Sequence, residues 1–201
     1  MAEASYSIAY TLGDLQLHVC AFSGDLEGLK YLVENEGANV NARDDFDCTP
    51  LHLAPYSGNI AVLAYLIERV EDVDARDKHG ATAFHNAMDV GNIKGGEMLL
   101  AHKAELNAQD NDGNNAAHRV ARTNYINSAE FLVERNVDLT VLNTKQQTPV
   151  DVARENRSKN IRELFEQALR EMQRIAPTNS DVPYPPARPR DLRGGLTSIP
   201  K

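Results

Sequence analysis

The sequence repeats one pattern at a nearly constant interval. Residue pairs that end in histidine recur at intervals of 34, 33 and 33 residues, and one more step of 33 reaches Val150-Asp151. Each pair precedes an apolar run long enough for a short helix. A single phase kept over five units predicts a stack of small repeats in place of one globule. The histidine pairs are Leu17-His18, Leu51-His52, Phe84-His85 and Ala117-His118.

Each unit predicts two short helices and a tight turn. Thr49 stands where a hydroxyl can cap the first free amides of a helix, and Pro50 occupies a first-turn position that needs no N–H. Gly58 can then end this first helix in the left-handed conformation. An apolar stripe marks the second helix, and the run Asp77-Lys-His-Gly80 predicts a hairpin turn. Because one such pair cannot bury both of its faces, neighbouring units must complete the core.

These residues resemble the ankyrin repeat family. The resemblance rests on the 33-residue period, the run Thr49-Pro-Leu-His52, a glycine in mid-unit and a leucine-rich second helix, and it covers roughly residues 10–170. It implies an all-α solenoid of stacked helix-turn-helix repeats with β-hairpin loops. An N-terminal extension of residues 1–9 would precede five repeats at about 10–43, 44–76, 77–109, 110–142 and 143–176, the first and last acting as caps.

The third unit departs from the pattern in its second helix. Gly95 and Gly96 stand where Val62 and Leu63 would pack in the second unit. Glycine inside a helix costs about 0.5–1 kcal/mol relative to alanine, and two apolar side chains are also lost. We therefore expect the third unit to be the least stable part of the array.

Charge and cysteine content narrow the class of protein. The 201 residues include 21 Lys and Arg against 29 Asp and Glu, a net charge of −8. This balance disfavours nucleic-acid binding through bulk charge. Two cysteines without a Cys-x-x-Cys pair favour a reducing compartment. The sequence shows neither a signal-peptide pattern nor a membrane-spanning apolar stretch, so we expect an intracellular protein, cytoplasmic or nuclear, without a membrane partner.

The composition changes after residue 176. Six of the nine prolines fall in residues 177–201, where four cations against two acids give a net charge of +2 and leave −10 for the preceding residues. This predicts a Pro/Arg-rich flexible tail. Residues 183–190 offer Pro-x-x-Pro spacings that a polyproline-reading domain could bind. The alternatives are a solvated tail without a specific reader and a tail that binds the acidic array.

Catalytic and metal sites are not indicated. The four registered histidines would lie about 8–10 Å apart on stacked helices, too far for one zinc ion, so a structural role is favoured. The run Asp110-Asn-Asp-Gly-Asn114 lacks the glycine and the acid that a calcium loop needs further along. Acidic neighbours would raise the pKa of Cys48, which argues against a nucleophile. We expect no enzymatic activity, no cofactor and no metal.

The remaining candidate for a functional site is a surface that binds another protein. The resemblance implies that turn tips and the first helices form a concave face that binds another protein, and the net charge suggests basic patches on that partner. We expect an adaptor, scaffold or regulator; the alternative is a regulatory module that controls an enzyme or channel. Phe46 and Tyr56 are the strongest candidates because exposed aromatics dominate many interfaces, although Tyr56 could instead pack on the neighbouring first helix. The full set is Asp45, Phe46, Cys48, Tyr56, Ser57, Lys78, His79, Asp89, Val90, Asn111, Asp112, Asn114, Arg122, Thr123, Thr144, Lys145, Gln147 and Glu155.

Overall fold

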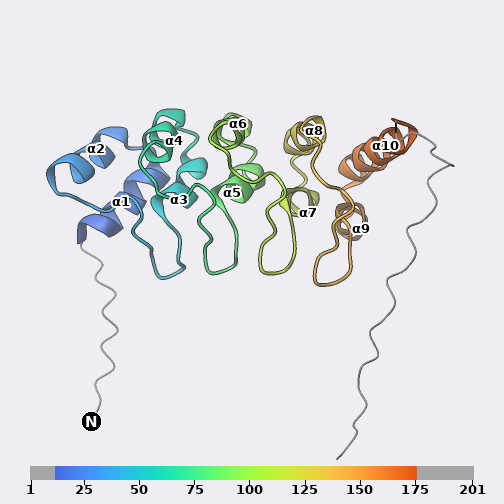
Figure 1. Cartoon of the computed structure of the whole chain (residues 1–201), viewed down its shortest axis with the longest axis horizontal. Helices are drawn as coiled ribbons and strands as arrows, with labels where there is room; N and C mark the ends of the chain where they lie inside the picture. Colours follow the sequence, from blue (N-terminus) through green and yellow to red (C-terminus); the bar gives the residue numbers. More distant parts are fainter. Residues whose placement is uncertain (1–11, 176–201) are drawn as a thin grey trace, which may run out of the picture.

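The described part of the chain, residues 12–175 of a computed structural model, consists of helices and the loops between them (Figure 1). The predicted N-terminal extension and the Pro/Arg-rich tail lie outside the described residues. The helices of the described part are α1 Leu12–Ser23, α2 Leu26–Asn35, α3 Pro50–Ser57, α4 Ile60–Ile67, α5 Ala83–Asp89, α6 Ile93–Ala101, α7 Ala116–Thr123, α8 Ile126–Glu134, α9 Pro149–Glu155 and α10 Lys159–Ile175.

The helices form pairs that stack side by side. Odd-numbered helices form one row, even-numbered helices form a second row, and the connecting loops project from the side of the first row (Figure 1). Each odd-numbered helix packs on its own partner, and each one before α9 also packs on the next odd-numbered helix, as α1 does on α2 and α3. The predicted all-α solenoid is confirmed.

The core is thin because it is assembled from pairs. The residue before each registered histidine is buried in every pair, with Leu17 and Leu51 almost fully enclosed. The even-numbered helices contribute Leu66, Leu99 and Leu132, all fully buried, at matching positions. Each pair therefore presents one small layer of apolar side chains to its neighbour, an arrangement that needs no tryptophan and few aromatics.

The registered histidines join one pair to the next. In α3, Nδ1 of His52 accepts a hydrogen bond from the backbone N–H of Thr49, and Nε2 lies 3.1 Å from the carbonyl oxygen of Ala81 in the following loop. His18 and His118 make the same link to the carbonyl oxygens of Cys48 and Gln147, each at 2.9 Å. These contacts confirm a structural role for the three imidazoles.

Two helix pairs lack this hydrogen bond from a registered histidine to the following loop. Among the residues that the structure describes, Nε2 of His85 is buried without a hydrogen-bond partner, and burial lowers the pKa of this histidine to about 3. In the last pair Asp151 takes the place of histidine and accepts both the N–H and the hydroxyl of Thr148, at 3.0 and 2.7 Å. Asp151 therefore caps α9 but sends no link onward, as expected at the end of a stack.

The glycines of α6 sit in a crowded interior. Gly95 and Gly96 are both buried, and a Cβ atom built on Gly96 would lie 2.3 Å from Cε of Met88. The ring of Phe131 in the next pair lies 3.6 Å from the same point. Side chains of the neighbouring helices thus occupy the space that a valine or leucine would fill at this position. This packing around α6 accompanies a helix that forms despite its two glycines.

Candidate partner-binding face

Four loops that precede odd-numbered helices share one backbone geometry. The first residue of each loop is Asp44, Asp77, Asp110 or Asn143, and its N–H donates to the carbonyl four residues later at 2.9–3.0 Å. One oxygen of its side chain accepts the N–H groups two and four residues onward; in the second pair these belong to Phe46 and Cys48, both at 2.9 Å. The tip residues between these anchors are therefore held outward in fixed positions.

Neighbouring tips are also linked to one another. The N–H of Lys78 donates to the carbonyl of Phe46 at 2.9 Å, and Asn111 and Thr144 donate in the same way to His79 and Asp112. Each neighbouring pair of loops shares one such backbone bond, too few for a ladder, and no strand is assigned within residues 12–175. The loops are hairpin-shaped without being β-ladders, and their tips form one continuous row.

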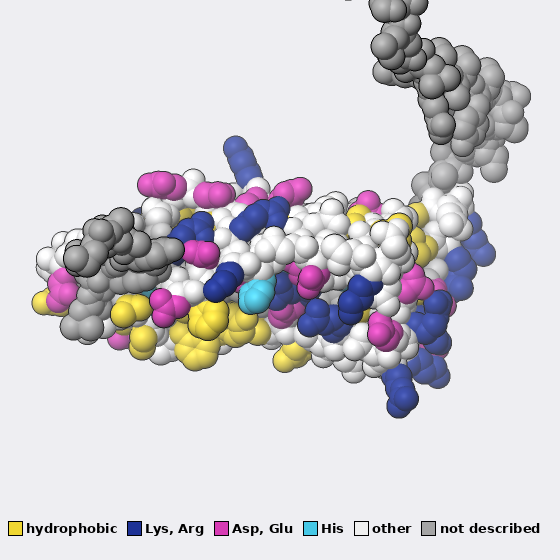
Figure 2. All heavy atoms as spheres, turned by 90° about the horizontal axis from the view of Figure 1, so that it is seen from below, with side chains coloured by type: hydrophobic (Ala, Val, Ile, Leu, Met, Phe, Trp, Pro, Cys, Tyr) yellow, Lys and Arg dark blue, Asp and Glu magenta, His cyan; other side chains and the backbone are white. Residues whose placement is uncertain are grey.

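We call the row of tips and the exposed side of the odd-numbered helices the tip face. Figure 2 views the molecule from this side and shows hydrophobic side chains gathered toward one end, with Lys and Arg more frequent toward the other. Most residues expected to bind a partner are exposed here. The exposed members are Asp45, Phe46, Tyr56, Lys78, His79, Asn111, Asp112, Arg122, Thr123, Thr144, Lys145 and Glu155.

Aromatic side chains mark the N-terminal end of the tip face. Phe46 at its tip is 61% exposed, and Tyr56 on α3 is 44% exposed. Tyr56 also packs against Phe22 of α1, with ring centroids 5.9 Å apart, so it is both part of the surface and in contact with the neighbouring first helix. Sequence reasoning missed Phe22, which is 56% exposed; its position 34 residues before Tyr56 was the available signal.

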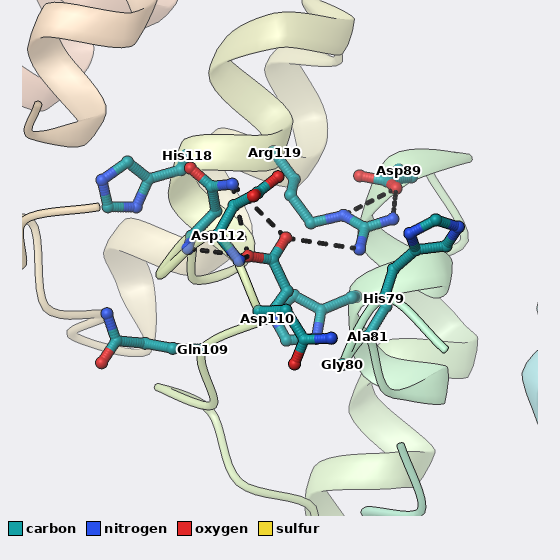
Figure 3. Close-up of polar contacts among 12 residues, drawn as sticks. His79, Gly80, Ala81, Asp89, Gln109, Asp110, Asp112, His118 and Arg119 are labelled. Atoms are coloured by element: carbon teal, nitrogen blue, oxygen red, sulfur yellow. Dashed lines mark hydrogen bonds and ion pairs between the residues drawn. The ribbon is translucent and has the colours of Figure 1, made fainter. Parts of the chain in front are cut away.

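Arg119 organises the middle of the tip face. This side chain of α7 reaches back to the preceding pair, where its guanidinium contacts Asp89 at the end of α5 through Nε at 2.9 Å and through a second nitrogen (Figure 3). Another guanidinium nitrogen lies 3.9 Å from Asp110 of the adjacent tip. Asp89 was expected to meet a partner, but its carboxylate is used to hold the third and fourth pairs together. Arg119 was not foreseen, because nothing in its own repeat marks it.

A polar cleft of about 320 Å³ lies between the last two tips. Arg122 and Lys145 line it together with the acids Asp112 and Glu155, and Gln147 donates a 2.7 Å hydrogen bond to Glu155 across it. This end of the tip face therefore offers both signs of charge to a ligand.

The remaining expected residues are less accessible. Asn114 is only 5% exposed and bonds to Asp110 and Asn143, so its side chain supports the tips and is not free for a partner. Cys48, Ser57, Asp89, Val90 and Gln147 are half-buried. Burial, followed by the charges of Asp44, Asp77 and Asp47, raises the pKa of Cys48 to about 12, so this thiol stays protonated at neutral pH.

The tip face carries charges of both signs. Its exposed bases are Arg43, Arg76, Lys78, Arg122 and Lys145, and its exposed acids are Asp45, Asp47, Asp112 and Glu155. The even-numbered helices also expose both signs, such as Lys94 and Glu97 on α6. Net charge alone therefore does not describe the surface that the tips present.

Stacked helix pairs, linked tips and histidine joints define a repeat solenoid of two-helix units. Two family models match the chain: ankyrin repeats in three copies over residues 17–110, and ankyrin repeats in many copies over residues 99–153. The chain belongs to the ankyrin repeat family, whose repeats are generally protein–protein interaction modules. Within residues 12–175, no helix is long and apolar enough to span a membrane.

One curated relative is alpha-latrocrustotoxin-Lt1a of Latrodectus tredecimguttatus. It is 39% identical over 61 residues, which are 30% of this chain and 4% of that protein. The chain therefore spans only a small fraction of that relative's length.

Proposed function

We propose that the chain is a non-enzymatic adaptor, scaffold or regulator that binds a partner protein through the tip face. The observation that carries this proposal is the group of exposed aromatic side chains, Phe22, Phe46 and Tyr56, on a face whose tips are fixed by hydrogen bonds. Exposed aromatics on a pre-organised surface supply binding energy at little cost in ordering. The family's general role as an interaction module supports the same function.

The chemistry of the surface suggests what the partner presents. An apolar segment would cover the aromatic end, and polar groups would meet Arg122, Lys145 and Glu155 at the other end. Basic patches on the partner, which net charge suggests, would meet exposed acids such as Asp45 and Asp112 beside the bases of the tip face. We assign the main binding energy to apolar contacts.

A second candidate is a regulatory module that controls an enzyme or channel. The Pro-rich segment 183–190, which lies outside the described residues, would then serve as a second docking or self-binding segment. We also propose that the protein is intracellular, on the strength of its two free cysteines, and that its five repeats have the bounds given above.

The test is recovery of partners from a cell extract by the immobilised chain. We expect Phe46→Ala/Tyr56→Ala to reduce recovery of the main partners at least about tenfold, since truncating central aromatics costs about 2 kcal/mol or more. Met172→Ala is the matched control, because Met172 is 37% exposed but lies on α10, which does not belong to the tip face. Equal recovery by the double variant and the wild type would exclude this face as the binding surface.

A further inference from the structure

The first helix pair exposes an unusually apolar outer face. Leu15 and Val19 on α1 are 46% and 65% exposed, and Tyr31 on α2 is 57% exposed. The pair of α1 and α2 stands at one end of the row of helix pairs, with no earlier pair stacked on it within the described residues (Figure 1). Clustered exposed apolar side chains of this kind mark a surface that something covers.

Equivalent positions in later pairs are buried against the preceding pair. Tyr65, which stands 34 residues after Tyr31, is 7% exposed and donates a 3.1 Å hydrogen bond to Glu34 of the first pair. Thr49, the counterpart of Leu15, is 4% exposed, and Arg119, three units after Val19, reaches back to Asp89. The first pair therefore carries the residues of an interior stacking surface at an end of the array.

The opposite end is built differently. The last helix, α10, exposes charged side chains along its length, including Glu163, Arg170 and Glu171, while Ile161 and Phe165 are buried toward α8 and α9. A polar outer face is what a terminal repeat needs in water. Within residues 12–175, the N-terminal end of the array lacks such a polar face.

The uncovered surface contains a defined groove. This groove has a volume of about 320 Å³ and lies between α1 and α2. Glu36, directly after α2, is the only carboxylate among its lining residues. The thiol of Cys20 lies in this groove and is half-buried. The lining residues are Gln16, Val19, Cys20, Gly28, Tyr31 and Leu32, with Glu36.

We propose that residues 4–11 of the same chain dock in this groove and cap the N-terminal end of the solenoid. The segment contains no charged residue, and Tyr6, Ile8 and Tyr10 alternate with small or polar residues. In an extended conformation these three side chains fall on one face, which suits a shallow apolar groove.

Chain geometry allows this docking. The segment joins α1 at Leu12, and Val19 lies seven residues further along the helix, about 10 Å away at 1.5 Å per residue. Eight extended residues span up to about 26–29 Å, so the segment can turn back and cross the groove. Its covalent attachment gives it an effective concentration in the millimolar range, which a second copy of the chain would not reach in dilute solution.

The test uses the two natural thiols of the full chain. Cys20 lies in the groove, and Cys48 lies in a loop of the second repeat, where its protonated thiol reacts slowly and any faster reaction reports unfolding. Maleimide modification of each thiol is followed by mass spectrometry in the wild type and in Tyr6→Ser/Ile8→Ser/Tyr10→Ser. We expect the substitutions to accelerate modification of Cys20 at least about fivefold while the rate at Cys48 is unchanged.

The matched control is Ser5→Ala/Ser7→Ala, which alters the other face of the segment and should leave both rates unchanged. Equal Cys20 rates in the wild type and the triple variant would overturn the proposal. So would protection of Cys20 that grows with protein concentration, because the occupant would then be a second copy. A rise at both thiols would mean that the triple variant unfolds, and the next measurement decides that case.

A second measurement tests the docking by disulfide formation and does not depend on the triple variant. In Ile8→Cys/Cys48→Ser, oxidised glutathione should drive an intramolecular disulfide between position 8 and Cys20. Thr144→Cys/Cys48→Ser, with its new thiol on a distant tip, should form no such bond. A yield for position 8 no higher than that for position 144 would contradict docking of the segment.

Discussion

At the residue scale, tip geometry depends on one position with a left-handed backbone. Gly80 and Gly113 fill it in two loops with φ of 75° and 76°, whereas Asp47 and Gln146 adopt φ of 58° and 59° in the other two. Left-handed backbone is strained for residues that carry a Cβ atom. The second and fifth tips therefore hold local strain that the third and fourth avoid.

Replacing Asp47 with glycine should relieve this strain. We expect Asp47→Gly to raise the free energy of unfolding by about 0.5–1 kcal/mol, because the relief exceeds the entropy gained by the unfolded chain. Urea denaturation followed by circular dichroism measures the change. The converse variant is Gly80→Ala, whose new Cβ would lie 2.7 Å from the backbone nitrogen of Asn111 and should destabilise the protein. Stabilisation by Gly80→Ala, or destabilisation by Asp47→Gly, would contradict this account of the tips.

Several residue roles could be predicted from the sequence, and others could not. The structural role of His52 was foreseen because its position recurs in phase from one repeat to the next, although its contact with Ala81 lies in the following repeat. Arg119 and Asn114 were not, because their partners come from other repeats or loops and the local pattern says nothing about them.

At the scale of elements, α6 is the helix whose sequence conflicts with its place in the fold. Its two glycines cost helix stability, yet Leu99 and the neighbouring Met88 remain fully buried. Substituting alanine for Gly95 would not simply stabilise α6, because the new Cβ atom would lie 2.9 Å from the side chain of Asn92 that caps this helix. The glycines are therefore built into the packing of the third pair.

Hydrogen exchange tests the stability of this pair. We expect the amides of residues 92–101 to exchange faster than those of residues 59–68, because the glycines lower the free energy needed to open α6 locally. Mass spectrometry of peptic fragments in heavy water measures both regions in one sample, and residues 126–134 of α8 provide an interior control. Equal protection of the two regions would show that burial of Gly95 and Gly96 compensates fully for their helix cost.

At the scale of the whole molecule, buried histidines couple the stability of the array to pH. Burial lowers the pKa of His52, His85 and His118, to about 3 for His85. In the unfolded chain these histidines take up protons near pH 6.5, whereas in the folded chain they stay neutral to lower pH. Their contribution to the free energy of unfolding is therefore fully present above about pH 6.5 and is lost as the pH falls below it. The lowered pKa of Asp151, which results from its bonds to Thr148, acts in the same direction at lower pH.

The free energy of unfolding should therefore decrease from pH 7 to pH 4.5, by at least about 2 kcal/mol given 1.36 kcal/mol per unit of pKa shift. Urea titrations at half-unit intervals of pH measure the slope. His79→Gln/His102→Gln removes two exposed histidines and should keep that slope, while His85→Gln should flatten it. A free energy of unfolding that stays constant between pH 7 and pH 4.5 in the wild type would contradict the expected contribution of the buried histidines.

The sequence by itself determined the repeat period and the paired helices, because these depend on contacts within about 33 residues that recur in phase. It also located most of the exposed tip residues. It did not predict that the first pair, expected to act as a cap, exposes apolar side chains. Only the tertiary structure decided which polar groups hold neighbouring pairs together, as Arg119 and Asp89 do, and which remain for a partner. It also decided that the two ends differ, since exposure depends on which neighbour is present to cover a face.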